Sequence, residues 1–169
     1  KFRKNILRRY PQIPTHDPQD ENGLNTNGIS SFLQDSSGVL WVGAWNEGLT
    51  KMVPGKNSQE ASWYHYRHDP NDPTSIGSDQ IHSIVRDSRG VLWIATVGGG
   101  MNKLIDLGNG KARFEKFRPD FGPEYDSNRL DILCEDAAGN LWLGGSSFFL
   151  FDPETEKFYR YVADAAKPD

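Results

Sequence analysis

The chain repeats itself at a long and nearly constant spacing. Three segments, at 28–52, 80–104 and 129–152, line up without a gap. Each holds an Asp-x-x-Gly turn followed by a Leu-Trp pair, and the tryptophans of these pairs are 52 and then 49 residues apart (Trp41, Trp93 and Trp142). A period of roughly 40 to 50 residues indicates an array of supersecondary units, as in propellers and solenoids.

Each repeated unit contains four short predicted strands. A mostly apolar run such as ISSFLQ (29–34) precedes the turn and is typical of a strand buried on both faces. The Leu-Trp strand and a third strand follow, and a fourth, such as SWYHYR (62–67), alternates aromatic and polar residues like a half-exposed outer strand. In the turn, we expect Asp to accept backbone hydrogen bonds and Gly to take a left-handed conformation. Four-stranded antiparallel meanders of this length predict an all-β fold of about three β-propeller blades.

The chain is predicted to form one partial propeller, 1–169, whose repeats span approximately 22–74, 75–126 and 127–169. Residues 1–21 correspond to the last strand, NILRRY (5–10), and the connector of a preceding blade. The Asp-Pro pairs of the connectors predict surface turns. A closed ring takes roughly four to eight blades. We therefore expect a slice of a larger propeller, or a chain that assembles with further copies.

Composition narrows the partners of this chain. A net charge of −4 supplies no long-range attraction for nucleic acid, and the basic run 1–10 suits a strand with a solvated polar side.

Cys134 is the only cysteine, which excludes an intrachain disulfide, and its alignment with Leu33 and Val85 predicts a buried small side chain. There is no apolar run of eighteen residues, and the chain begins at Lys1. We expect an excerpt of a longer product, attached to a membrane only through segments outside it.

The repeated motif resembles the two-component regulator propeller repeat, found in periplasmic sensor regions of bacterial hybrid histidine kinases and in some membrane-bound diguanylate cyclases. The residues that carry the resemblance are Asn27, Ile29, Asp35, Gly38, Leu40, Trp41, Gly43, Gly48 and Leu49, then Ile81, Asp87, Gly90, Leu92, Trp93, Thr96, Gly99 and Gly100, and in the third copy Asn128, Leu130, Asp136, Gly139, Leu141, Trp142 and Gly144. The third copy then departs, with Phe148 and Phe149 where glycines are expected. The resemblance implies a seven-bladed propeller, a periplasmic location and a kinase or cyclase output elsewhere.

Positions at which the copies differ are better binding candidates than the repeated ones, which the fold already explains. The turn between the second and third strands holds Trp45, Asn46 and Glu47 in the first copy only. An exposed tryptophan beside an amide and a carboxylate suits stacking on a sugar ring and hydrogen bonding to its hydroxyls. Packing of Trp45 against the next blade is an equal alternative.

A second candidate position lies in the first strand of each unit, where the copies hold Ser30, His82 and Asp131. These polar side chains either line a channel near the propeller axis or face axial water. The turn aspartates do not predict a metal site, because the third copy reads DAAG and loses side-chain ligands while keeping Asp and Gly. The sequence predicts no metal and no other cofactor.

These observations favour a non-catalytic sensor propeller, for which the resemblance implies oligosaccharides as one ligand class. A different hypothesis is a propeller lyase or hydrolase that uses His82 and Asp131 at the axis. A protein-interaction scaffold, which dimerising sensors would combine with ligand binding, is the third.

Overall fold

The structure is a computed structural model that describes residues 23–24, 28–56, 60–122, 129–145 and 147–161. Residues 1–21, with the strand predicted at 5–10 and the connector after it, lie outside these residues. The described residues form strands, turns and connecting loops, and they include no helix long and apolar enough to cross a membrane.

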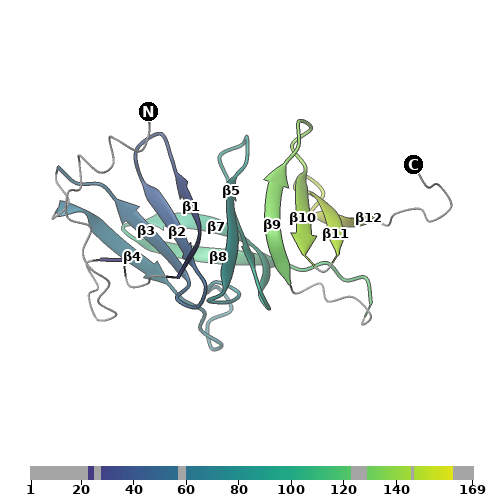
Figure 1. Ribbon diagram of the computed structural model, residues 1–169, viewed down its shortest axis with the longest axis horizontal. Helices are drawn as coiled ribbons and strands as arrows, with labels where there is room; N and C mark the ends of the chain where they lie inside the picture. Colours follow the sequence, from purple (N-terminus) through teal and green to yellow (C-terminus); the bar gives the residue numbers. More distant parts are fainter. Residues whose placement is uncertain (1–22, 25–27, 57–59, 123–128, 146, 162–169) are drawn as a thin grey trace.

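Three antiparallel sheets of four strands each stand side by side along the molecule (Figure 1). Blade one contains β1 (Ile29–Gln34), β2 (Leu40–Ala44), β3 (Leu49–Val53) and β4 (Ser62–Tyr66). Blade two contains β5 (Ile81–Arg86), β6 (Leu92–Thr96), β7 (Gly100–Gly108) and β8 (Lys111–Phe117). Blade three contains β9 (Leu130–Glu135), β10 (Leu141–Gly145), β11 (Phe148–Asp152) and β12 (Lys157–Tyr161). Each blade is a meander in chain order, so the predicted all-β propeller blades are confirmed.

The Asp-x-x-Gly turns are built in the same way in all three blades. Asp87 Oδ1 accepts hydrogen bonds from the N–H groups of Arg89 (3.0 Å) and Val91 (2.8 Å). Asp35 and Asp136 make the equivalent pairs of bonds. The turn glycines have left-handed φ angles of 84° to 89° (Gly38, Gly90 and Gly139). The structural role predicted for these residues is confirmed.

The hydrophobic core lies between the blades. The inner strands β1, β5 and β9 are neighbours across the middle of Figure 1. One cluster joins blades one and two around Trp41 and Ile81, and a second joins blades two and three around Trp93 and Leu130. Trp41 and Trp93 therefore each pack against the blade that follows in the chain.

A serine hydroxyl reinforces both junctions between blades. Ser31 Oγ accepts a hydrogen bond from the N–H of Ile84 at 3.1 Å, and Ser83 Oγ accepts one from the N–H of Leu133 at 3.2 Å. Because these bonds cross from one sheet to the next, they fix the position of neighbouring inner strands as well as holding them together.

Two expectations about inner-strand burial are wrong. β1 has no fully buried residue, and Cys134 in β9 is exposed, although its counterparts Leu33 and Val85 pack into the clusters between blades. The burial differs because of the place of each blade in the row, since Leu33 and Val85 each face the blade that follows. Cys134 points from the last sheet toward a side where the described residues supply no further blade.

The gapless alignment of the third copy is also wrong beyond Gly144. In the strand register, Gly43 pairs with Leu49 and Ala95 with Met101, whereas Gly144 pairs with Phe148. The third hairpin is thus two residues shorter than the others. Phe148 and Phe149 do not replace turn glycines, and Phe149 instead occupies the place of the buried polar residues Thr50 and Asn102.

Candidate functional site

The candidate site lies at the end of the molecule opposite the Asp-x-x-Gly turns, which we call the loop end. Here the β2–β3 and β6–β7 turns meet the connector between blades one and two. The N–H of Gly48 donates to Asp79 O at 3.0 Å, and the N–H of Val97 donates to Gln80 O at 3.0 Å. These bonds hold the connector between the two turns, so the turns and the connector converge at this end.

The repeated polar position coincides with a β-bulge in each inner strand. The register shifts across Ser30 in blade one, across His82 in blade two, and opposite Asp131 in blade three. A bulge places an extra residue outside the regular ladder and redirects its side chain. The fold therefore presents one irregular, polar position per blade at the start of the inner strand.

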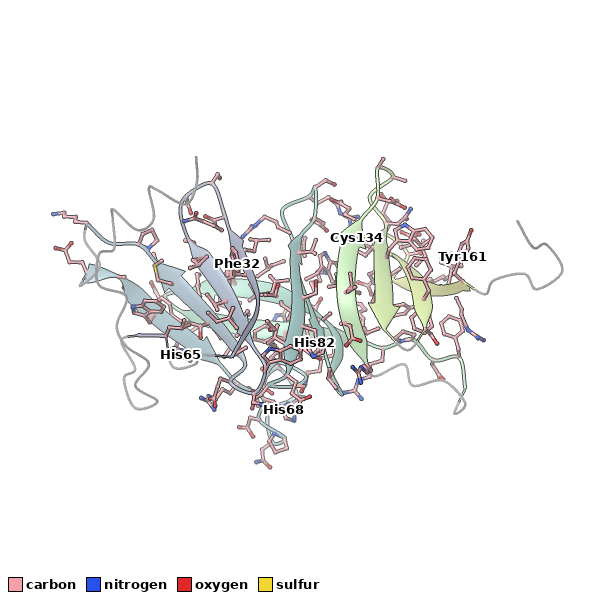
Figure 2. The ribbon with its side chains drawn as sticks, in the orientation of Figure 1. Phe32, His65, His68, His82, Cys134 and Tyr161 are labelled. Carbon is pink, nitrogen blue, oxygen red and sulfur yellow. The ribbon has the colours of Figure 1, made fainter. Side chains whose placement is uncertain are left out.

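The structure brings three of the predicted site residues together. His82 Nδ1 lies 2.7 Å from Asp131 Oδ1, which joins blade two to blade three. The indole of Trp45 meets the His82 ring edge to face, with the ring centroids 4.5 Å apart. We call Trp45, His82 and Asp131 the axial cluster. Figure 2 shows His82 at the loop end, with His68 nearby at the lower edge of the molecule.

Trp45 packs against the next blade and is nevertheless partly exposed. Its ring packs on His82 of the next blade, yet 49% of the residue is exposed, whereas the His82 side chain is mostly buried. A fixed, half-exposed indole is a suitable platform for stacking an apolar ring face. Packing against the neighbouring blade therefore orients the tryptophan without covering it.

Asn46 belongs to an adjoining pocket rather than to the axial cluster. This loop pocket has a volume of about 430 Å³ and is lined by Asn46, His68, Gly77, Ser78, Asp79, Gln80 and Gly98. Its lining offers amide, hydroxyl and carboxylate groups, which are the groups that bind sugar hydroxyls. Some lining groups are already engaged, since Asp79 Oδ1 accepts from the N–H of His68 at 2.7 Å.

The two remaining predicted residues lie outside both features. Glu47 forms an ion pair with Arg67 at the end of β4, which ties the β2–β3 turn to the outer strand. Ser30 Oγ donates to Gly43 O at 3.1 Å within its own blade. Both residues therefore already have a partner within blade one.

Arg129 is a site residue that the sequence reasoning missed. Its Nε lies 3.3 Å from Asp131 Oδ2, and its terminal nitrogens make no hydrogen bond to the described residues. The other copies hold Gly28 and Gln80 at this position. The criterion that singled out the β2–β3 turn, variation between copies, identifies Arg129 as well. A half-exposed guanidinium thus borders the axial cluster.

These features define a class of protein: a row of propeller blades with an aromatic cluster and a polar pocket at one end. Comparison with known families narrows this class further. The sequence profile of the two-component regulator propeller matches residues 23–46 and 75–98, which confirms the resemblance over these two segments. Both matches end at the β2–β3 or β6–β7 turn.

Solved structures agree with this assignment. The chain is similar to the extracellular domains of two systems from B. thetaiotaomicron that are described as hybrid two-component systems. The first is 25% identical, with a TM-score of 0.64 over 83% of this chain and 19% of that one. The second is 26% identical, with a TM-score of 0.63 over 91% of this chain and 21% of that one. The chain spans about a fifth of the length of these relatives.

A more distant similarity concerns the fold alone. Virginiamycin B lyase from Staphylococcus aureus is 11% identical, with a TM-score of 0.56 over 89% of this chain and 45% of that one. No curated protein sequence matches the chain.

Proposed function

We propose that the chain is the ligand-reading part of an extracytoplasmic, non-catalytic sensor of the two-component type. The observation that carries the proposal is the axial cluster, in which Trp45 is oriented by His82 of the next blade and remains half exposed. Support also comes from the family repeats and from the extracellular domains to which the chain is similar. The signal passes to an output domain outside this chain.

The ligand class is an oligosaccharide. Trp45 stacks on one sugar ring, and Asn46 of the adjoining loop pocket hydrogen bonds to hydroxyl groups. A pocket of about 430 Å³ is in the usual size range for small-molecule sites. Arg129 and His82 add hydrogen-bond donors beside Asp131.

The test is binding to a panel of neutral and uronic-acid oligosaccharides, measured as a shift in melting temperature and by isothermal titration calorimetry. A ligand that binds only the folded chain raises the melting temperature by mass action. Trp45→Ala should abolish the shift. Tyr159→Ala is the matched control, since Tyr159 is an aromatic residue of similar exposure (50% against 49%) on the outer strand β12.

Two results would contradict the proposal at different levels. A shift that persists in Trp45→Ala rejects the axial cluster as the site but keeps a sugar ligand. A complete lack of binding across the panel rejects the ligand class.

The His82–Asp131 contact favours a second candidate function. An imidazole with Nδ1 held by a carboxylate and Nε2 free of hydrogen bonds to the described residues is the arrangement of a general base. A propeller lyase or hydrolase acting on glycans or lactones would use it. Turnover of a glycan or lactone by the wild type that disappears in His82→Ala would establish this function. No turnover across a panel of glycans and lactones would argue against it and favour the sensor function.

A further inference from the structure

Another pocket lies between blades one and two, at the end of the molecule that carries the Asp-x-x-Gly turns. It has a volume of about 360 Å³, and its lining includes Trp41 of blade one and Arg86, Arg89, Lys103 and Asp106 of blade two. We call it the turn-end pocket. Its walls come from two blades of this chain, so it does not depend on the outer side of blade one or of blade three.

The indole nitrogen of Trp41 is a buried hydrogen-bond donor without an acceptor in the described part of the chain. Only 3% of this residue is exposed. A buried indole N–H ordinarily has an acceptor, so one without a partner requires an explanation. Because Trp41 lines the turn-end pocket, a molecule bound there would supply the acceptor.

The other two blades show which acceptor this nitrogen takes. In both of them it donates to a carboxylate oxygen of the turn aspartate, at 2.9 Å in blade two and at 3.0 Å in blade three. Asp35, the turn aspartate of blade one, makes no such bond, and its Oδ2 lies 3.6 Å from Arg86 instead. The repeat therefore indicates a carboxylate as the partner of the Trp41 indole.

The charge of the lining also suits an anion. Arg86, Arg89 and Lys103 bring cationic groups to the pocket, whereas its acidic residue, Asp106, is already paired with Lys51 at 2.5 Å. Arg89 and Lys103 are themselves paired with acidic residues of blade two. The cation that remains for a ligand is therefore Arg86.

The guanidinium of Arg86 keeps hydrogen-bonding capacity. Its Nη1 donates to Gly90 O at 3.0 Å, whereas its Nη2, at 3.6 Å from Asp35, is too far away for a hydrogen bond. A guanidinium binds a carboxylate through charge-assisted and often bidentate hydrogen bonds. Trp41 and Arg86 thus place a neutral and a charged donor on one pocket from two neighbouring blades.

Tyr66 is another buried donor at this junction. Its ring stacks with that of Trp41, with centroids 6.2 Å apart, and its hydroxyl also has no hydrogen-bond partner among the described residues. Burial, and after it the charge of Asp106, raise the pKa of Tyr66, so the hydroxyl stays protonated and remains a donor. Two donors without acceptors therefore lie at the junction that holds the turn-end pocket.

We propose that the turn-end pocket binds a small organic carboxylate, whose oxygens accept hydrogen bonds from Trp41 Nε1 and from the guanidinium of Arg86. The ligand carboxylate takes the role that the turn aspartate has in blades two and three. A volume of about 360 Å³ is in the usual size range for small-molecule sites. This site lies at the opposite end from the axial cluster and is independent of the sugar binding proposed there.

The test is a titration of the isotope-labelled chain with succinate, followed by NMR through the indole N–H signals of its five tryptophans. A Trp41→Phe variant identifies the Trp41 signal. We expect succinate to move this signal downfield until it saturates, because the N–H gains a charged acceptor. Succinamide, which is similar in shape but uncharged, should leave it in place. The Trp45 signal should not move, which separates this site from the axial cluster.

Arg86→Gln should weaken succinate binding about tenfold or more, because the charge-assisted hydrogen bonds to the carboxylate are lost. Arg118→Gln is the matched control. It removes the same charge at the loop end, where Arg118 donates to Gly98 O at 3.4 Å, and it should bind succinate as the wild type does. The dispersion of the tryptophan signals shows whether each variant is folded.

Three results would overturn the proposal. A Trp41 signal that does not move in millimolar succinate would show that its indole takes no ligand of this class. An equal response to phosphate and sulfate would indicate a general effect of anions rather than a carboxylate site. An unchanged affinity in folded Arg86→Gln would place succinate elsewhere on the chain.

Discussion

At the scale of single residues, the tryptophan of the Leu-Trp pair does not make the same hydrogen bond in all three blades. Trp93 Nε1 donates to Asp87 Oδ2 at 2.9 Å, and Trp142 Nε1 donates to Asp136 Oδ2 at 3.0 Å. Trp41 Nε1 is buried without a hydrogen-bond partner among the described residues, while Asp35 lies 3.6 Å from Arg86. The three copies thus share the position of the tryptophan ring, but the hydrogen bond from its Nε1 to the turn aspartate forms only in blades two and three.

This difference predicts unequal costs for one substitution. Trp93→Phe should lower the free energy of unfolding by about 1 to 3 kcal/mol more than Trp41→Phe, because only Trp93 loses a bond to a buried charged group. The two variants remove the same atoms from equivalent positions, so each is the control for the other. Urea unfolding measures both. Equal costs would show that the hydrogen bond to Asp87 adds nothing to stability.

The charge of Asp87 predicts a dependence of stability on pH. Burial opposes ionisation of this carboxyl, but hydrogen bonds from Trp93, the N–H of Val91 and Arg89 outweigh it and lower its pKa. A lowered folded-state pKa means that the carboxylate stabilises the fold above the unfolded pKa of about 3.9, and that this stabilisation disappears as the pH falls through the folded value. The gap in unfolding free energy between wild type and Asp87→Asn should therefore be constant above about pH 5 and shrink toward pH 3. Urea unfolding at four pH values measures the gap, and a gap that stays constant to pH 3 would be the contrary result.

Part of the site could be predicted from single residues. Variation between internal copies identifies Trp45, His82 and Asp131, which the structure brings together. It cannot show that Glu47 pairs with Arg67, because that contact depends on how the β2–β3 turn lies against the end of β4. The sequence places a residue in a turn, whereas packing decides which neighbour it meets.

At the scale of elements, hydrophobic periodicity and turn chemistry predict the strands well. The inner strand of blade one begins and ends at the expected residues, 29 and 34. The failure is the third hairpin, where two aromatic residues were aligned with turn glycines. A hairpin can lose two residues and keep its side-chain alternation, because strand faces repeat every two residues. Alternation alone therefore does not detect the shortened turn.

The connector between blades depends on one buried amide. Asn102 Oδ1 accepts a hydrogen bond from the N–H of Gly77 at 2.8 Å, and its Nδ2 donates to Gly100 O at 3.2 Å. Gly77 is required here, since a Cβ at this position would lie 2.5 Å from Gly99 O. The amide thus fixes the connector at the loop pocket.

Replacing this amide should loosen the connector selectively. Asn102→Leu leaves the buried Gly77 N–H without an acceptor, which costs about 1 to 3 kcal/mol. Amide hydrogen exchange at Gly77, measured by NMR, should become faster. Thr50→Val is the control at the equivalent position of blade one, where the hydroxyl bonds to His65 within the blade, and Gly77 exchange should stay unchanged. Unchanged Gly77 exchange in Asn102→Leu would mean that other contacts hold the connector.

At the scale of the whole molecule, stability comes from contacts between neighbouring blades. Blade two packs on both sides, against blade one around Trp41 and against blade three around Trp93. All five residues of β6 are buried. In an array whose units contact only their neighbours, stability is close to a sum of unit and interface terms. A unit with two interfaces is then more stable than one with a single interface.

This arrangement predicts an order of local opening. Hydrogen exchange followed by mass spectrometry should show the slowest exchange in β6 and faster exchange in β9 and β10, because blade three packs against a neighbour on one side only among the described residues. Uniform exchange across the three blades would instead mean that the chain unfolds as one cooperative unit, with its interfaces too strong to separate.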